Sequence, residues 1–126
     1  MIAYFDTNAL LWLSEGSLAG RTPKIDRVLE EADLFFSPMV LLELEFLYEI
    51  KRIKLPASDI QHKVEYELGV RLCNLPFAAV ASAALDEKWA SDPFDRMIVA
   101  NAKANGFAWL ISADEAIRKH YPRAVW

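Results

Sequence analysis

The sequence predicts an α/β fold in which a central, mainly parallel β-sheet is flanked by helices on both faces. Short apolar runs alternate along the chain with longer segments that carry helix-capping residues and prolines. Such alternation is typical of parallel sheets, whose strands are joined by helices. The chain has 126 residues, 54% of them hydrophobic, and no stretch rich in Pro, Gly or Ser divides it. We therefore expect a single domain over residues 1–126.

Five short apolar segments are expected to be the strands. Residues 2–5 form an apolar run that leads directly into Asp6, which is typical of a buried strand. The other expected strands span residues 34–36, 70–72, 107–111 and 124–126.

Capping residues, prolines and glycines mark the expected helices. Thr22 and Ser37 each stand before a proline, and this pair of residues is typical of a helix N-terminus. Pro56 should end the helix that Ser37 begins, and Ser58 should cap the next helix. Helices are expected over residues 9–13, 22–32, 37–53, 58–68, 77–85, 92–105 and 114–119.

The composition limits the possible classes of protein. The N-terminus has no basic start and only a short apolar run before Asp6, so we expect no signal peptide. The longest apolar-rich stretch, residues 39–44, is broken by Glu43 and Glu45, so we expect no membrane span. The single cysteine, Cys73, can form no internal disulfide and is expected to be a buried thiol, which favours a cytoplasmic protein. The net charge of −4 counts against broad electrostatic attraction to nucleic acid.

Two acidic residues follow expected strands. Asp6 ends the first strand, and Asp114 comes just after the strand that ends at Ile111. Ligands of open α/β sheets bind beyond the carboxyl ends of the strands, so both side chains are expected at that edge. A simpler role is open for each, because an aspartate before a helix is a good N-cap. Thr7 and Asn8 could cap the first helix equally well, so the cap does not require Asp6.

Two more acidic residues lie on apolar faces of expected helices. Glu43 falls opposite Glu45, which should face water, and Asp95 falls beside Ile98. A lone buried carboxylate costs on the order of several kcal/mol unless it is paired or bound to a metal ion. Structural alternatives stay open here too: a buried ion pair for Glu43, and a capping box that Asp95 forms with Asp92.

Together the four acids indicate a site for a hard divalent cation. Oxygen ligands without an accompanying Cys/His cluster select Mg²⁺ or Mn²⁺. Clustered carboxylates would repel one another without such an ion. A bound ion would also lower the pKa of a water molecule and so supply hydroxide for attack on a phosphodiester. The four acids are Asp6, Glu43, Asp95 and Asp114.

Four blocks of the sequence resemble the PIN-domain nucleases, and especially the VapC-type toxins of toxin–antitoxin pairs. The blocks are residues 4–9 (YFDTNA), 37–44 (SPMVLLEL), 92–100 (DPFDRMIVA) and 110–114 (LISAD). Their order matches the family, and they are spread over nearly the whole chain. The third block is the most specific of the four.

The resemblance implies a PIN-like fold with a twisted, mainly parallel sheet and Mg²⁺- or Mn²⁺-dependent endoribonuclease activity. It assigns metal binding and catalysis to the four acids, although the fourth acid is less uniform in the family. It also implies a homodimer and a cognate antitoxin that occupies the catalytic groove. Residues expected to orient the carboxylates or bound water are Thr7, Asn8, Ser37, Asp92 and Ser112.

Basic and aromatic residues allow further hypotheses. Arg96, in the third block, is the best-placed candidate for an RNA phosphate contact. The basic cluster at residues 51–54 is more simply a solvated helix end. His62 and His120 lie far from the acidic blocks, so catalysis by imidazole is not expected. The tryptophans are expected mainly in the core or at an interface.

Two other functions stay open. A phosphotransferase of the haloacid-dehalogenase kind also begins with a strand that ends in Asp, but it needs a second Asp where Asn8 stands. A PIN-like domain kept only as a non-catalytic binding module would be indicated by the loss of an acid, and all four acids are present. An active metal-dependent ribonuclease is therefore the preferred interpretation.

Overall fold

The computed structural model describes all residues from Met1 to Trp126 and has a five-stranded sheet at its centre. The strands are β1 Ile2–Phe5, β2 Asp33–Phe36, β3 Arg71–Leu72, β4 Trp109–Ile111 and β5 Ala124–Val125. From one edge of the sheet to the other their order is β3-β2-β1-β4-β5, and every pair of neighbours is parallel. The α/β class predicted from the sequence is confirmed.

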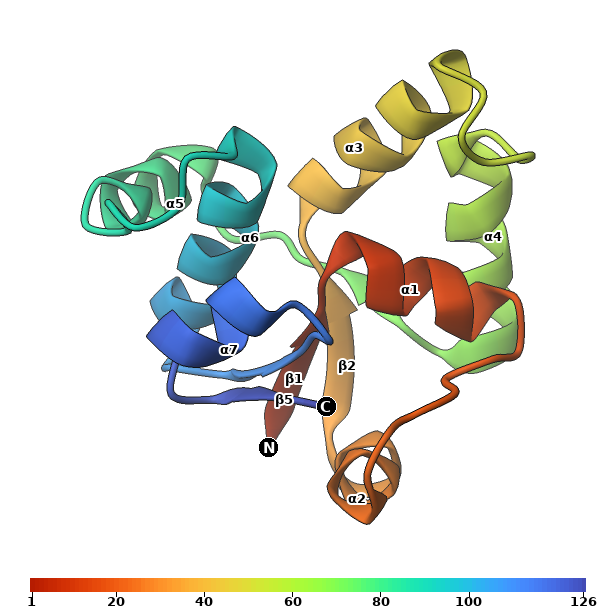
Figure 1. Cartoon of the computed structure of the whole chain (residues 1–126), viewed down its shortest axis with the longest axis horizontal. Helices are drawn as coiled ribbons and strands as arrows, with labels where there is room; N and C mark the ends of the chain where they lie inside the picture. Colours follow the sequence, from red (N-terminus) through yellow and green to blue (C-terminus); the bar gives the residue numbers. More distant parts are fainter.

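Helices connect the strands and cover the sheet. They are α1 Thr7–Ser14, α2 Pro23–Glu31, α3 Pro38–Glu49, α4 Ala57–Leu68, α5 Phe77–Ala84, α6 Pro93–Ala104 and α7 Glu115–His120. Figure 1 shows α5 and α6 on one side of the strands and α1 and α4 on the other. The helix α5 packs on α6, both α1 and α3 pack on α4, and α3 also contacts α6. The two groups of helices therefore meet at α3.

The central strand β1 marks the point where the strand order reverses. It pairs with β2 on one side and with β4 on the other, and Phe5 lies level with both Phe36 and Ile111. The three strands therefore end at the same edge of the sheet. Ligands of open parallel sheets bind at this carboxyl edge, next to such a switch point. The first residues after these strands are placed where a site is expected.

The core is formed by the sheet and the inner faces of the helices. Tyr4 and Phe5 of β1, Phe36 of β2 and Leu110 of β4 have no exposed surface. A parallel strand covered by helices on both faces has no polar side, which explains why β1 is a continuous apolar run. Cys73 is a buried free thiol, as predicted, and the tryptophans pack partly buried against the core.

The helix α3 is shorter than the sequence predicts. It was expected to reach Ile53 but ends at Glu49. Lys51 adopts the left-handed conformation with φ of 63°, and the N–H of Arg52 donates to the carbonyl of Leu47. This is the Schellman pattern, in which glycine usually takes the left-handed position. Because a lysine stands there, the sequence carries no sign of the early end.

The start of α4 also differs from the prediction. Ser58 was expected to cap this helix, but the helix begins at Ala57 and Pro56 takes the N-cap position. The N–H of Ala57 instead donates to Glu45 Oε1 of α3, at 3.1 Å. A side chain from a neighbouring helix therefore satisfies this free helix end. Glu45 is half-buried by this contact, whereas the sequence predicted that it faces water.

Smaller differences concern single residues. The strand β4 begins at Trp109 rather than at residue 107, because Phe107 takes a φ of 56° that a strand cannot continue. Thr22 holds the N-cap position of α2 as predicted, but its hydroxyl donates to the carbonyl of Trp126 and not to the helix. A membrane-crossing helix would have to be longer and more apolar than any helix of the structure.

Candidate active site

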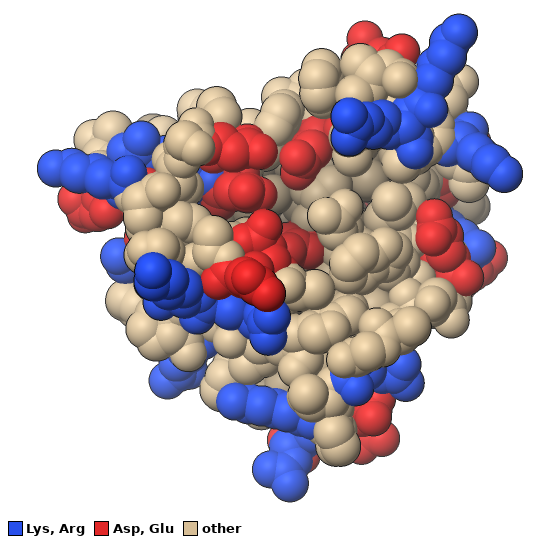
Figure 2. Space-filling model, viewed as in Figure 1, with Lys and Arg blue, Asp and Glu red and all other residues tan.

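A small cavity lies at the carboxyl edge of the sheet, beyond the ends of β1 and β4. Its volume is about 160 Å³, and no hydrophobic side chain lines it. In Figure 2, acidic side chains gather around a hollow on this face, and the Lys and Arg side chains lie outside it. We call this site the acidic cavity. Its lining residues are Asp6, Thr7, Asn8, Glu43, Asp92, Asp95 and Asp114. The structure thus brings together all four acids singled out in the sequence.

Asp6 joins the central strand to α1 and is only 6% exposed. Its N–H donates to the carbonyl of Ile111 at the end of β4, and its Oδ1 accepts from the N–H of Ala9 at 2.8 Å. Asp6 is therefore the N-cap of α1. In the structure the hydroxyl of Thr7 donates to Glu43, so Asp6 rather than Thr7 makes this cap.

Glu43 projects from α3 into the cavity and is half-buried. Its Oε1 accepts a hydrogen bond from the hydroxyl of Thr7 on α1. No lysine or arginine pairs with this carboxylate, so the alternative of a buried ion pair does not hold. The second oxygen of Glu43 is left for a ligand or for water.

Asp92 and Asp95 reach the cavity from the N-terminus of α6. Asp92 is the N-cap, because its Oδ1 accepts from the N–H of Phe94 at 2.8 Å. Asp95 sits one turn further, half-buried and lining the cavity. The prediction that Asp92 caps the helix while Asp95 points toward the interior is confirmed.

Asp114 forms the side of the cavity that follows β4, and Ser112 lies buried two residues before it. Asp114 caps α7, since its Oδ1 accepts from the N–H of Ile117 at 2.9 Å. Ser112 has no exposed surface, and its Oγ accepts from the N–H of Asp114 at 3.1 Å. A hydrogen bond from Ser112 also helps to hold down the pKa of Asp6. Ser112 therefore links the first and fourth acids.

Burial and mutual repulsion raise the pKa of three carboxyl groups. Desolvation raises the pKa of Asp6 to about 6, to which the charges of Asp114 and Glu43 contribute. Desolvation raises the pKa of Asp95 to about 7, with repulsion from Asp92 as the next largest cause. The pKa of Glu43 is also raised by burial. The protein holds negative charges together that nothing in the cavity offsets.

The side-chain atoms that line the acidic cavity are of the kind that bind a hard divalent cation. All seven lining side chains offer oxygen atoms, and none is Lys or Arg. However, no three acidic, histidine or cysteine side chains already stand close enough together to hold an ion. A hydrated divalent cation needs only one or two direct carboxylate ligands, so this spacing does not conflict with such an ion.

Three residues predicted at the site, Ser37, Ser112 and Arg96, lie outside the cavity lining. Ser37 is buried and caps α3, with its Oγ accepting from the N–H of Met39 at 3.2 Å. The guanidinium of Arg96 donates to the carbonyls of Ala84 and Leu85, at 2.7 and 3.1 Å. Arg96 thus ties the start of α6 to the end of α5. Its contact with an RNA phosphate stays a prediction and would require these bonds to be given up.

Neither histidine lies in the acidic cavity. His62 is exposed on α4 and stacks on Tyr66, with ring centroids 4.4 Å apart. His120 lies in the last turn of α7 and stacks on Trp89, with ring centroids 4.7 Å apart. Imidazole acid–base chemistry at the cavity therefore has no candidate residue.

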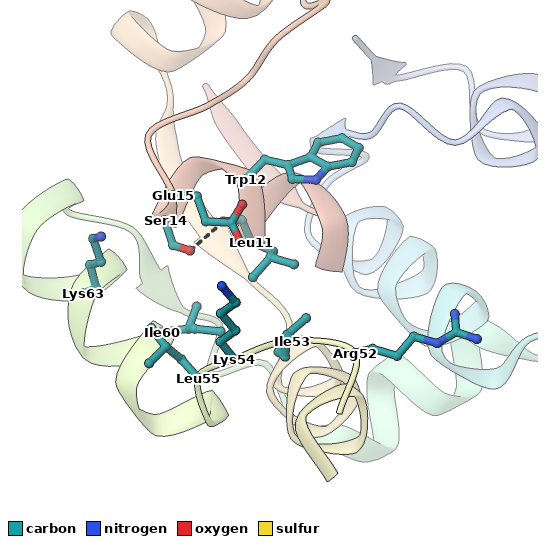
Figure 3. Close-up of a pocket in the computed structure, with 10 residues that line it drawn as sticks. All are labelled: Leu11, Trp12, Ser14, Glu15, Arg52, Ile53, Lys54, Leu55, Ile60 and Lys63. Carbon is teal, nitrogen blue, oxygen red and sulfur yellow. Dashed lines mark hydrogen bonds between the residues drawn. The ribbon is translucent and has the colours of Figure 1, made fainter. Parts of the chain in front are cut away.

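A second, larger pocket lies between α1, α4 and the loop that precedes α4. Its volume is about 600 Å³. Figure 3 shows the side chain of Lys54 extending from the loop toward Leu11, whereas Arg52 points away from the centre. Three separate segments build this pocket, so no local pattern in the sequence announces it. We call it the α1–α4 pocket, and it is lined by Leu11, Trp12, Ser14, Glu15, Arg52, Ile53, Lys54, Leu55, Ile60 and Lys63.

Several solved structures share this fold. The chain is similar to one in the complex of VapBC2 from Rickettsia felis with a DNA fragment from their promoter, at 16% identity and a TM-score of 0.65, over 99% of this chain and 96% of that one. It is also similar to a chain of a toxin–antitoxin complex from Klebsiella pneumoniae, at 19% identity and a TM-score of 0.62, over 98% and 96%. The chain is similar to FitAcB from Neisseria gonorrhoeae as well, at 16% identity and a TM-score of 0.54, over 99% of this chain and 96% of that one.

The sequence itself matches one family. No curated protein compared with the chain matches it. The profile of the PIN domain matches residues 3–121. This range includes all four acids, β2, β3, β4 and all of β1 but its first residue, and it ends before β5. The four sequence blocks, the parallel sheet and the acidic cavity agree with this match, and the chain belongs to the PIN domain family.

Proposed function

We propose that this chain is a cytoplasmic, metal-dependent endoribonuclease and the toxin of a type II toxin–antitoxin pair. The observation that carries the proposal is the acidic cavity, where carboxyl groups from four separate segments face one hollow that no basic residue lines. A divalent ion would offset their repulsion. Membership of the PIN domain family and the fold shared with VapBC proteins support the same function.

The four acids would hold Mg²⁺ or Mn²⁺ in the acidic cavity. Such an ion supplies hydroxide at neutral pH by lowering the pKa of bound water, and it offsets charge on the phosphodiester. The hydroxyl of Thr7 fixes one oxygen of Glu43, and the N–H of Ala9 fixes one oxygen of Asp6, so that both carboxylates keep their orientation. Asn8 is exposed at the rim, where its side-chain amide can donate to a phosphate oxygen.

The net charge of −4 requires that RNA be held by local positive charge. Figure 2 shows Lys and Arg side chains beside the acidic hollow and over the loop between α3 and α4. In that loop Lys51, Arg52 and Lys54 are exposed. Reversing these three charges together should weaken RNA binding, and unchanged binding would reject this route for the substrate.

The test of the proposed function is cleavage of a mixed RNA pool by purified protein with Mg²⁺, with Mn²⁺ and with EDTA. Asp6→Asn and Asp95→Asn should lose activity, because each removes a charged ligand, while Glu49→Gln on the exposed side of α3 serves as the matched control. Cleavage that survives both chelation and substitution contradicts the proposal. Metal binding without cleavage of any RNA would indicate a non-catalytic binding module instead.

The α1–α4 pocket supports the proposed antitoxin as a partner. Half of its lining side chains are hydrophobic, and three of the others are Arg52, Lys54 and Lys63. A peptide segment with apolar residues flanked by carboxylates would match both features. Co-expression with the polypeptide encoded beside this gene tests the idea. Lys54→Glu combined with Lys63→Glu should weaken the complex, whereas Lys88→Glu, on an exposed loop, should leave it intact.

We also propose that the protein is a homodimer. Large apolar side chains are exposed on α3, where Leu42 is 57% exposed, and on α5, where Phe77 is 70% exposed; Leu85 at the end of α5 is 67% exposed. Both helices contact α6, and apolar groups left in water on them favour a second copy of the chain. Light scattering at micromolar concentration should give a dimer, and Phe77→Asp should shift it toward the monomer. A monomeric wild-type protein would contradict the proposal.

A further inference from the structure

Four polar side chains form a hydrogen-bonded cluster inside the core. The hydroxyl of Tyr4 on β1 donates to Sγ of Cys73, which follows β3, at 2.9 Å. Asn105, at the end of α6, donates from Nδ2 to the Tyr4 hydroxyl at 2.8 Å. Asn101 of α6 donates from Nδ2 to Cys73 Sγ at 3.1 Å. We call these four residues the tyrosine cluster.

Three of the four side chains of the tyrosine cluster are buried, and Asn105 is half-buried. Tyr4 has no exposed surface, Asn101 is 2% exposed and Cys73 is 4% exposed. No buried side-chain nitrogen or oxygen in the structure lacks a partner. Burial raises the pKa of Tyr4 well above its usual value, so the phenol stays a neutral donor. Breaking one bond here would leave a polar group unsatisfied in a dry interior, which is costly.

The cluster joins the two segments that carry Asp6 and Asp95. Tyr4 lies on β1, and Asp6 follows that strand directly, two residues further along the chain. Asn101 lies six residues after Asp95 in α6, and Asn105, ten residues after it, is the C-cap of the same helix. A shift of α6 along its axis by one residue would move Asp95 by about 1.5 Å relative to Asp6.

Apolar packing has no preferred direction, so polar contacts can add to it in fixing the register of α6. Besides Asn101, the buried residues of this helix are Ile98, Val99, Ala100 and Ala102, two of which are alanines with small, smooth side chains. A buried asparagine among such residues can fix the register of a helix, because its hydrogen bonds form in one position only. The tyrosine cluster supplies such a contact between α6, β1 and the segment after β3.

We propose that Tyr4, Asn101 and Asn105 are positioning residues, which fix the height and rotation of α6 on β1 and so hold Asp95 at its distance from Asp6. The inference rests on the proposed function, because it gives the tyrosine cluster a role in binding the metal ion. Cys73 contributes as the acceptor that two of these side chains share. The cluster itself touches neither metal nor RNA.

The test compares Tyr4→Phe with Tyr121→Phe. Tyr121 is a matched control, because it is also a buried tyrosine and its hydroxyl donates to the carbonyl of Ala108 at 2.6 Å, outside α6. In Tyr4→Phe the dissociation constant for Mn²⁺, measured by calorimetry, should rise about tenfold. The kcat for RNA cleavage should fall about tenfold with KM unchanged, because substrate contacts are retained. Tyr121→Phe should leave all three values near those of the wild type.

A second pair of variants tests the shared acceptor. Cys73→Ser keeps an atom that accepts from Asn101 and should retain Mn²⁺ affinity, whereas Cys73→Val has no acceptor and should lose it. A merely structural role would give losses that follow the thermal stability of the variants instead. Equal loss of Mn²⁺ affinity in Cys73→Ser and Cys73→Val, or in Tyr4→Phe and Tyr121→Phe, would overturn the proposal.

Amide hydrogen exchange on the metal-free protein separates this inference from the proposed function. In Tyr4→Phe the amides of residues 95–98 should exchange faster, with circular dichroism confirming that the fold is retained. Unchanged exchange there, together with unchanged Mn²⁺ affinity, would refute the positioning role. A wild-type protein that binds no Mn²⁺ and cleaves no RNA would instead refute the proposed function, and exchange at α6 would still decide whether the cluster positions this helix.

Discussion

Thr7, in the first turn of α1, donates a hydrogen bond to Glu43 on α3 across the acidic cavity. The two residues are 36 positions apart in the chain, so this bond joins two helices that border the cavity. It holds one oxygen of the carboxylate in place and leaves the other accessible. Glu43 therefore reaches the cavity already oriented, which should matter more for an ion than for the stability of the fold.

Removing the hydroxyl of Thr7 should therefore weaken metal binding. Thr7→Val keeps the shape of the side chain, and we expect the Mn²⁺ dissociation constant to rise about tenfold, as is usual for residues that orient a ligand. Isothermal titration calorimetry measures this. Thr22→Val is the matched control, because the hydroxyl of Thr22 donates to Trp126 away from the cavity. Equal affinities for wild type and Thr7→Val would show that the bond does not orient a ligand.

Asp95→Asn should stabilise the metal-free protein at neutral pH. The folded protein raises the pKa of Asp95 from 3.8 to about 7, so it binds a proton that the unfolded chain releases. Stability must then fall as the pH rises from about 4 to 7. Asparagine removes this effect, and after screening by solvent the gain at pH 8 should be on the order of 1 kcal/mol.

Thermal unfolding in EDTA checks the prediction for Asp95. The variant should melt higher than the wild type at pH 8, by roughly 4 °C, and the difference should shrink toward pH 4. Asp86→Asn, on an exposed loop, is the control and should show no such trend. A variant that melts lower than the wild type at pH 8 would mean that the carboxylate of Asp95 is not under repulsion.

Metal affinity should increase with pH over the range in which the buried acids titrate. The pKa of Asp6 is raised to about 6 and that of Asp95 to about 7, so below these values an ion must displace protons. Mn²⁺ binding should therefore strengthen between about pH 5.5 and 8 and then level off. Calorimetry in two buffers of different ionisation enthalpy should detect the released protons. Affinity that is constant over this range would argue against direct binding by these two carboxylates.

Asp114 has two possible roles that two substitutions can separate. Its Oδ1 caps α7, and asparagine caps as well as aspartate does. Asp114→Asn should thus keep the stability but lose Mn²⁺ affinity, whereas Asp114→Ala should lose both, with about 1 kcal/mol of stability from the missing cap. Urea unfolding and calorimetry give the two quantities. Full Mn²⁺ affinity in Asp114→Asn would assign this residue to capping alone.

Glu45 should contribute to stability through the helix that it caps from outside. Its Oε1 accepts from the N–H of Ala57, so Glu45→Ala leaves the first turn of α4 without this acceptor. We expect a loss of about 1 kcal/mol in the free energy of unfolding, the usual value of a cap. Glu49→Ala on the exposed end of the same helix should change it little. Similar values for the two variants would show that water replaces the cap without loss.

The parts of the fold that depend on local patterns could be predicted from the sequence. The strand β1 is apolar because it is covered on both faces, and α6 begins at the Asp92-Pro93 pair that the sequence marks. The same holds for the acids. Strand ends place Asp6 and Asp114 at the carboxyl edge, and helical periodicity turns Glu43 and Asp95 inward.

What could not be predicted depends on contacts between distant segments. The cap that Glu45 gives to Ala57 spans 12 positions and replaces the local cap expected from Ser58. Lys51 ends α3 in a conformation that normally indicates glycine. Arg96 was predicted to contact RNA because it is next to Asp95 in the sequence. Its bonds to the carbonyls at the end of α5 depend on the packing of α6 against α5 and could not be predicted.

Three acids of the cavity, Asp6, Asp92 and Asp114, are also the N-caps of α1, α6 and α7. Asparagine serves equally well in that position, and a single-base transition in an aspartate codon produces it. Under the proposed function, mutation would thus most readily yield a chain that has lost its cleavage activity but keeps its fold and its surfaces. Such an inactive chain would still bind the antitoxin. Inactive copies would therefore compete with active ones for the antitoxin in the same cell.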